Sequence, residues 1–307
     1  MELTPTLFDR SNIRVLHLET TTRCNAACPQ CARTDPRAGL VAQHDLSLDQ
    51  VQKMFDVEFI QQLDKIFACG NFGDPAVSGD TMQIFEWAKL ANPGIVLGMN
   101  TNGGVRDSRW WQRMGQMLSG PLDYVVFAID GLADTNHIYR QRVNFDHVMQ
   151  SAQAFIQAGG HAHWDMLIFE HNQHQVDQCR QLARDMGFTR FRTKVSSRFA
   201  ERPVEFLQAP TGHEHMPIAT GNIQCHAVKE HSLYVSATGE ILPCCFIGAD
   251  IFTLSSTAKR YIQQPGYQDL ISSWDSDPLL VCKQNCSSQN NTTRFYQQWQ
   301  EDTDLLC

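Results

Sequence analysis

Short apolar runs alternate with longer amphipathic stretches over the first two thirds of the chain. The stretch Phe145–Ala158 repeats apolar residues at the i, i+3, i+4 spacing of one helix face, and similar helices are expected at 49–63, 81–90, 109–118 and 176–186. The apolar runs have the length of buried strands and lie at 15–18, 65–68, 95–99, 124–129, 164–169 and 191–195. Strands that alternate with crossover helices predict a parallel α/β sheet with right-handed connections.

Polar residues and glycines gather directly after these predicted strands. The segments that follow the six strands are, in order, Cys24–Cys31, Gly70–Pro75, Asn100–Gly104, Asp130–Gly131, Glu170–Asn172 and Ser196–Arg198. In parallel α/β sheets, binding and catalytic sites form at the carboxyl ends of the strands. We therefore expect all six segments to meet at one functional rim.

Composition narrows the class of protein. The 307 residues are 42% hydrophobic, which is enough for a core, and they carry a formal charge of −8. No apolar run approaches the ~20 residues of a membrane span, and the N-terminus lacks a signal peptide, so we expect a cytoplasmic protein without membrane contact. The acidic balance argues against binding to duplex nucleic acid but does not exclude it, and it leaves a single nucleotide open.

Eleven cysteines are the unusual part of this composition. In a reducing cytoplasm, thiols are more often metal ligands or catalytic groups than disulfides. Cys24, Cys28 and Cys31 form one tight cluster that can converge on one centre. Three thiolates leave a fourth ligand position open, as in an iron–sulfur cluster with one free iron. A zinc knuckle with a remote fourth ligand is the alternative.

The motif CNAACPQC after a strand resembles the radical S-adenosylmethionine (SAM) superfamily. The segments GDP at 73–75, TNG at 101–103 and AIDG at 128–131 resemble its later strand-end motifs, in the same order. The resemblance implies a partial (β/α)6 barrel and a [4Fe–4S] cluster on Cys24, Cys28 and Cys31. It also implies SAM on the open iron and an electron donor such as flavodoxin or ferredoxin. Reductive cleavage of SAM would give a 5′-deoxyadenosyl radical that abstracts hydrogen from the substrate.

The resemblance also assigns SAM contacts to single residues of the rim. Gly73 and Asp74 would present groups to the SAM amine, and Thr101 and Asn102 would lie near its methionine or ribose part. Ser196, at the end of the sixth strand, would lie near adenine or ribose. The alternative for each of these residues is a turn or a cap.

Two positions depart from the superfamily pattern. Gln30 stands before the third cysteine, where an aromatic residue is common, and Ala128 stands where the fourth strand commonly carries serine. The serine contact to the SAM carboxylate is therefore missing. Arg140, Arg142 and Lys194 are the candidates to replace it.

A second cysteine set lies in the last third of the chain. Leu233–Ser236, a Thr238-Gly239 turn and Ile241-Leu242 predict a β-hairpin, and Phe199–Gly221 reads as a connector. We therefore expect a radical SAM partial barrel over 1–199 and a second domain over 200–307. The hairpin and its cysteines resemble the twitch/SPASM-like extension of radical SAM enzymes, a small β-hairpin/α unit that binds an auxiliary [4Fe–4S] cluster.

Cys225, Cys244, Cys282 and Cys286 are the ligands that this second resemblance implies, with Cys245 as a substitute for Cys244. A structural zinc site with four cysteines is the alternative. Cys69, Cys179 and Cys307 keep no required role.

Glu170, His171 and Asp165 are the candidates for substrate contact or proton removal, because they lie at or near the end of the fifth strand. The function predicted is a radical SAM oxidoreductase or isomerase. Its substrate would be a small molecule or a modified amino-acid or nucleotide moiety. The alternatives are a radical SAM peptide maturase, a phage-type DNA-base hypermodification isomerase, and a non-catalytic iron–sulfur or zinc protein.

Overall fold

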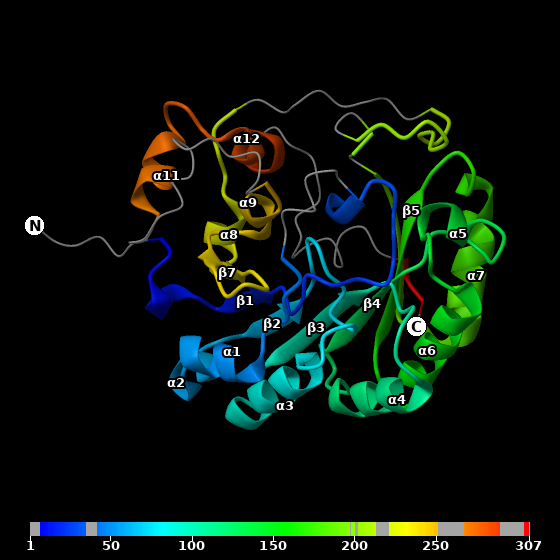
Figure 1. The fold of residues 1–307 in the computed structure, drawn as a ribbon, viewed down its shortest axis with the longest axis horizontal. Coiled ribbons are helices and arrows are strands. Elements are labelled where there is room, and N and C mark those ends of the chain that lie inside the picture. The colour runs from blue at the N-terminus through cyan, green and yellow to red at the C-terminus, as the bar shows by residue number, and fades with distance from the viewer. Residues whose placement is uncertain are drawn as a thin grey trace, which may run out of the picture.

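One curved sheet organises the molecule (Figure 1). The computed structural model describes residues 7–34, 42–196, 198–199, 202–212, 221–250, 267–288 and 304–306, so Cys307 lies outside the described residues. The strand order is β8-β7-β1-β2-β3-β4-β5-β6-β9. Neighbouring strands from β7 through β6 in this order are parallel, whereas β8 and β9 are antiparallel edges.

The six predicted barrel strands are present, with ends within a few residues of those expected. They are β1 (Val15–Leu18), β2 (Lys65–Ala68), β3 (Val96–Thr101), β4 (Tyr124–Ala128), β5 (Ala162–Ile168) and β6 (Arg190–Val195). The helices between them are α1 (Leu48–Met54), α2 (Val57–Gln61), α3 (Thr81–Ala91), α4 (Ser108–Met117), α5 (Asn136–Tyr139), α6 (Phe145–Gln157) and α7 (Val176–Met186). The predicted partial barrel is confirmed.

One helix prediction was wrong in its continuity. The stretch 49–63 forms two helices, α1 and α2, because the chain turns at Phe55 and Asp56. The Asp56 carboxylate accepts a hydrogen bond from the Phe59 amide at 2.8 Å and caps α2. The Asp56 cap thus starts a new helix and interrupts the helical spacing of apolar residues.

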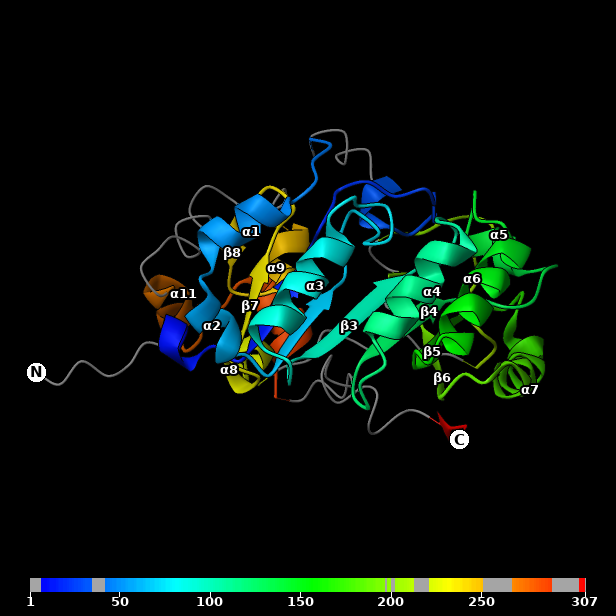
Figure 2. The same cartoon turned by 90° about the horizontal axis from the view of Figure 1, so that it is seen from below.

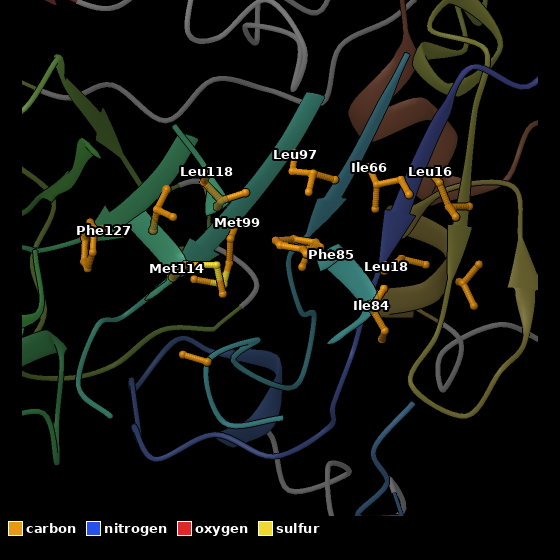
Figure 3. Packing of buried hydrophobic residues seen from close by; sticks show 14 of the residues in the cluster. Leu16, Leu18, Ile66, Ile84, Phe85, Leu97, Met99, Met114, Leu118 and Phe127 are labelled. Carbon is orange, nitrogen blue, oxygen red and sulfur yellow. The ribbon is translucent and has the colours of Figure 1, made fainter. Parts of the chain in front are cut away.

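The two faces of the sheet carry different chemistry. The helices cover its outer face (Figure 2), and alternate strand residues meet them in a continuous apolar core. Figure 3 shows this layer, in which Ile66 and Leu97 of the strands lie beside Phe85 of α3, with Phe127 and Leu16 farther out on either side. The inner face carries the intervening residues, among which aromatic, imidazole and charged side chains are frequent.

The C-terminal segment continues the same sheet. The predicted hairpin is present as β7 (Ser232–Val235) and β8 (Ile241–Leu242), and β7 pairs in parallel with β1. The helices α8 (His226–Lys229), α9 (Cys245–Asp250), α11 (Gln268–Ser273) and α12 (Leu280–Cys286) gather at this end of the molecule (Figure 1). β9 (Asp304–Leu305) pairs with β6 at the opposite edge. The division at 199 remains a prediction, and the sheet crosses it without interruption.

Among the described residues, no helix has both the length and the apolar character that a membrane crossing requires.

Candidate functional site

Cys24, Cys28 and Cys31 lie in the loop that leaves the carboxyl end of β1. The amide of Cys31 donates to the carbonyl of Cys28 at 3.0 Å, which makes a tight turn. The Thr34 hydroxyl donates to the carbonyls of Cys28 and Cys31, at 2.9 Å each, and closes the loop. All three thiols are free, with Cys28 buried and the other two half-buried. One short, internally bonded loop therefore presents three sulfurs.

Burial disfavours the thiolate forms of Cys24 and Cys28. Burial raises the pKa of Cys24 to about 12, and the Asp74 carboxylate and the neighbouring thiols Cys28 and Cys31 add to the rise. Burial also raises the pKa of Cys28, and Arg140 opposes this rise. Three thiolates at such a site repel one another, so they would need a positive centre to hold them together. This donor set fits a cluster that binds thiolate sulfur.

A zinc ion and an iron–sulfur cluster make different demands on the spacing of the three sulfurs. Within the described ranges, no three His, Cys, Asp or Glu side chains are arranged to hold one metal ion. Zinc bonds to sulfur are about 2.3 Å long, so a zinc site needs its sulfurs nearly in contact. An iron–sulfur cubane is larger, and each thiolate binds a different iron.

The Asp74 carboxylate joins the ends of β2 and β3 beside Cys24. Its Oδ1 accepts from the Thr101 hydroxyl at 2.8 Å and from the Ala76 amide at 2.9 Å. Its Oδ2 accepts from both the backbone and the side-chain nitrogen of Asn102, at 2.7 Å each. The Asn102 side chain also approaches the Cys24 sulfur at 3.6 Å. Three predicted SAM contacts thus form one network, in which Asp74 is already saturated with donors.

Gly73 lies where only a glycine fits. A Cβ at this position would lie 1.8 Å from the Thr21 carbonyl oxygen, so the backbone of the β2 loop passes directly over the start of the cysteine loop. The amides of Phe72 and Gly73 donate to Oε1 of Glu19, at 2.6 and 3.2 Å. A buried carboxylate at the end of β1 therefore sets the path of the loop that precedes Asp74.

Glu19 also joins this loop to the C-terminal hairpin. The Tyr234 hydroxyl of β7 donates to its Oε2. The Asn71 side chain donates to the Tyr234 hydroxyl at 3.1 Å and to the Cys245 carbonyl at 2.9 Å. Sequence reasoning missed Glu19, whose only signal was an acidic residue at the end of a buried strand, five positions before Cys24.

The three candidates for the missing serine contact lie in different surroundings. Arg140 is buried, with its Nε 2.7 Å from Oδ2 of Asp130 and its Nη1 3.8 Å from the Cys28 sulfur. Arg142 is exposed. Lys194 lies on β6 and bonds to Asp165. Arg140 is therefore the candidate beside the cysteine loop.

Ser196 bonds to the cysteine loop. Its hydroxyl donates to Oε1 of Gln30 at 2.7 Å, and it accepts from the Arg198 amide at 3.2 Å. Gln30 is fully buried, and its side-chain nitrogen donates to the Arg202 carbonyl at 3.3 Å. The residue that departs from the superfamily pattern thus ties the loop to the end of β6. Sequence reasoning noted Gln30 as a departure and missed this role.

The candidates for substrate chemistry are spread along β5 and the loop after it. Asp165 lies within β5, between two cations of β6. Glu170 is exposed, and its amide donates to the Gln208 carbonyl at 3.1 Å. The His171 ring stacks on Phe169 at 5.2 Å, and burial lowers its pKa. These three residues do not form a compact catalytic group.

The second cysteine set lines one small apolar cavity. Cys225, Cys244, Cys282 and Cys286 share its wall with Ile223, Pro243, Phe246, Ile247, Leu270, Trp274 and Val281. Cys286 donates to Cys225, a contact that lowers the pKa of Cys225 and raises that of Cys286. Burial raises the pKa of Cys282 to about 12, and the neighbouring Cys225 adds to the rise. Four thiols from three separate segments thus line one mostly apolar cavity.

Cys244 and Cys245 lie in different surroundings. Cys244 lines the cavity, where burial raises the pKa of its thiol well above the ordinary value. The pKa of Cys245 is raised to about 12 by burial and then by Cys69, at the end of β2. Cys245 therefore belongs to the junction with the barrel, and Cys244 belongs to the cavity.

Comparison with known proteins gives the fold. No family model and no curated protein matches the chain. The structure of SuiB from Streptococcus suis bound to its precursor peptide SuiA matches with a TM-score of 0.57 and 13% identity, over 91% of this chain and 68% of that one. SuiB bound to S-adenosylmethionine matches with a TM-score of 0.54 and 14% identity, over 87% and 67%.

The structure of anSMEcpe with bound AdoMet matches with a TM-score of 0.55 and 14% identity, over 88% of this chain and 82% of that one. At this level of identity, the likeness establishes the fold. The chain therefore shares the partial-barrel fold of these solved structures, which is the fold that the resemblance of its strand-end motifs implied.

Proposed function

We propose that the chain is a radical SAM enzyme whose first [4Fe–4S] cluster is held by Cys24, Cys28 and Cys31. The observation that carries this proposal is the loop that presents these three thiols beside the Asp74 network. The loop lies at the carboxyl end of β1, on a fold shared with two proteins solved with AdoMet bound. When bound, such a cluster supplies the electron that cleaves SAM to methionine and a 5′-deoxyadenosyl radical.

The chain's own residues would bind and orient SAM. Gly73 brings the backbone of the β2 loop close to the cysteines, and we assign this backbone to the SAM amine. Asp74 has no lone pair left after four hydrogen bonds, so it would act by holding Thr101 and Asn102 in place. Ser196 would contribute near adenine or ribose. We assign Arg140 to the carboxylate side of SAM, because it lies beside Cys28.

We propose that Cys225, Cys244, Cys282 and Cys286 bind an auxiliary [4Fe–4S] cluster, which the shared cavity supports. A cluster with four protein ligands can exchange one electron with a substrate radical, which would make the reaction an oxidation. Without that exchange, the reaction would be a rearrangement. The enzyme is accordingly an oxidoreductase or an isomerase.

The proposed substrate is a small molecule or a modified amino-acid or nucleotide moiety. A peptide maturase is the second candidate, because SuiB is solved with its precursor peptide and anSMEcpe with the Cp18Cys peptide. A phage-type DNA-base isomerase would need a nucleic-acid contact. Assays with each class of substrate, read by deuterium transfer into 5′-deoxyadenosine, distinguish them.

The first test uses the full chain, reconstituted with iron and sulfide without oxygen. We expect about eight iron atoms per chain, and 5′-deoxyadenosine once a reductant and SAM are added. Cys28→Ser should lose about half of the iron and all of the 5′-deoxyadenosine. Cys179→Ser is the matched control, because Cys179 is also buried but lies on α7. A colourless protein that binds zinc and cleaves no SAM would reject the proposal.

A further inference from the structure

The inner face of the sheet carries two pairs of stacked rings, which the Lys65 side chain connects. His17 of β1 stacks on Phe67 of β2 with ring centres 4.1 Å apart, and Tyr124 of β4 stacks on His163 of β5 at 5.1 Å. The Lys65 ammonium lies 4.7 Å from the centre of the Tyr124 ring. These contacts cross the sheet from β1 to β5. They define the wall that a substrate inside the partial barrel would face.

A charged group follows on β5 and β6. The Arg192 guanidinium bonds to Asp165 through two nitrogens, at 3.0 and 2.6 Å. The Lys194 ammonium bonds to the same carboxylate at 2.9 Å. Among the described residues the group contains two cations and one anion, so these three side chains together carry a net positive charge. The exposed fraction of the side chain is 4% for Arg192, 10% for Asp165 and 46% for Lys194, so the charge opens to solvent at Lys194.

The surroundings leave this positive charge in place. The pKa of His163 is lowered to about 3 by burial and then by the nearby cations, with Arg190 first among them. The pKa of His17 is lowered to about 4 by burial, and Lys65 contributes. Both imidazole rings are therefore neutral near pH 7, and nearby basic side chains help to lower their pKa values. Lys65, Arg192 and Lys194 thus place cations on the inner face of a chain whose formal charge is −8.

The other buried carboxylates of the site have partners of their own. Glu19 accepts from Tyr234 and the β2 loop, and Asp74 accepts four hydrogen bonds. Asp130 pairs with Arg140 at 2.7 Å. Each of these carboxylates is thus committed to a structural contact. A ligand with a negative charge would complete the group around Lys194.

We propose that the Lys194 ammonium, held by Asp165 beside Arg192, binds an anionic group of the substrate, either a carboxylate or a phosphate. This inference rests on the proposed function and narrows its substrate class. An ammonium has three donors, and Asp165 takes one of them, so two remain to be directed at a ligand oxygen. Arg192 is engaged by the carboxylate in a fork, so it supplies charge and orients Asp165.

The test measures anion binding to the cluster-loaded full chain with SAM at saturation. The probes are inorganic phosphate and acetate, titrated by calorimetry at an ionic strength held constant with chloride. We expect Lys194→Met to weaken the binding of the preferred probe at least tenfold and Lys194→Arg to retain most of it. Lys53→Met is the matched control, because Lys53 is exposed on α1 and pairs only with Asp49 among the described contacts.

The two probes in this titration distinguish a phosphorylated substrate from one with a carboxylate. Tighter binding of phosphate supports a phosphorylated substrate, and tighter binding of acetate supports a carboxylate. Binding that occurs only when SAM is absent would assign Lys194 to the SAM carboxylate and overturn the inference. Equal binding by Lys194→Met, or no binding by the unaltered chain, would also overturn it. Iron content and 5′-deoxyadenosine from the same preparation report separately on the proposed function.

Discussion

At the scale of single residues, Asp165 shows how surroundings decide what a carboxylate can do. Burial opposes its ionisation, but Lys194 and Arg192 outweigh that effect and lower its pKa. A carboxylate held ionised by two cations is a weak proton acceptor near neutral pH. Its place on the predicted fifth strand suggested proton removal, whereas its contacts in the middle of β5 favour an anchoring role. Asp165 therefore anchors Arg192 and Lys194 on the inner face of the sheet.

Removing this charge should cost stability. Asp165→Asn leaves the buried Arg192 without its ion pair, and breaking a buried pair in this way costs about 3–5 kcal/mol. Asp49→Asn removes an exposed ion pair of α1 and should cost about 0.5 kcal/mol or less. Urea unfolding at pH 7, monitored by circular dichroism, measures both. Equal midpoints for the two variants would contradict the anchoring role.

The ion pairs of Asp165 also predict the direction in which stability changes with pH. The pKa of Asp165 is lower in the folded chain than the ordinary value near 3.8, so its contribution to stability is complete above that value. The contribution is lost as the pH falls below it. The difference in unfolding free energy between the unaltered chain and Asp165→Asn should therefore shrink in acid. Urea titrations of the cluster-free protein at pH 7 and near pH 3 measure this change.

At the scale of elements, β7 links the C-terminal hairpin to the loop that we assign to SAM. Tyr234 projects from β7 to Glu19, and Glu19 holds the amides of Phe72 and Gly73. The Asn71 side chain bonds to both Tyr234 and the carbonyl of Cys245, which adjoins the cavity cysteine Cys244. A continuous chain of hydrogen bonds therefore runs from Cys245, the neighbour of the cavity cysteine Cys244, to the β2 loop.

Removing the Tyr234 hydroxyl from this hydrogen-bond chain should weaken SAM binding. Tyr234→Phe leaves the buried Oε2 of Glu19 without its donor, which costs about 1–3 kcal/mol and loosens the loop at Gly73. We expect weaker SAM binding to the cluster-loaded protein, measured by calorimetry, with iron content unchanged. Tyr124→Phe, on the same face of the sheet but on β4, should leave SAM binding near its original value. Equal affinities in the two variants would separate the hairpin from SAM binding.

Local sequence signals predicted the elements and the rim, because strands, helices and strand-end motifs depend on neighbouring residues. The contacts that complete the site depend on distant ones. Tyr234 and Glu19 are 215 positions apart, and Ser196 and Gln30 are 166 positions apart. Cys244 and Cys245 are adjacent in sequence, so a local pattern does not tell their surroundings apart. Their surroundings differ because α9 begins at Cys245. Such pairings follow from the packed sheet, and no local pattern encodes them.

At the scale of the whole molecule, two cysteine sets lie at separate places on one sheet. The first set follows β1, and the second gathers around α9 and α12 beside β7. Cluster binding to the folded form alone stabilises that form, because the unfolded chain offers no assembled site. Each cluster should then stabilise the part of the sheet that holds it.

This expectation can be measured by thermal unfolding without oxygen. The reconstituted chain should unfold at a higher temperature than the chain from which an iron chelator has removed the metal. Cys282→Ser should lose about half of the iron and only part of the thermal shift, because the first cysteine set is intact. Cys179→Ser should keep the full shift. If the metal-free chain unfolds at the same temperature as the reconstituted chain, neither cluster stabilises the fold.

The parallel pairing of β7 with β1 also has a consequence for how the protein is made. β1 emerges from the ribosome long before β7, the strand that covers one of its edges and begins only at Ser232. Until then, Leu16 and its neighbours present unpaired backbone groups on that side, a surface that other nascent chains can join. Proper folding therefore waits for late synthesis, and a chaperone that shields the early strand during translation would increase the yield of native protein.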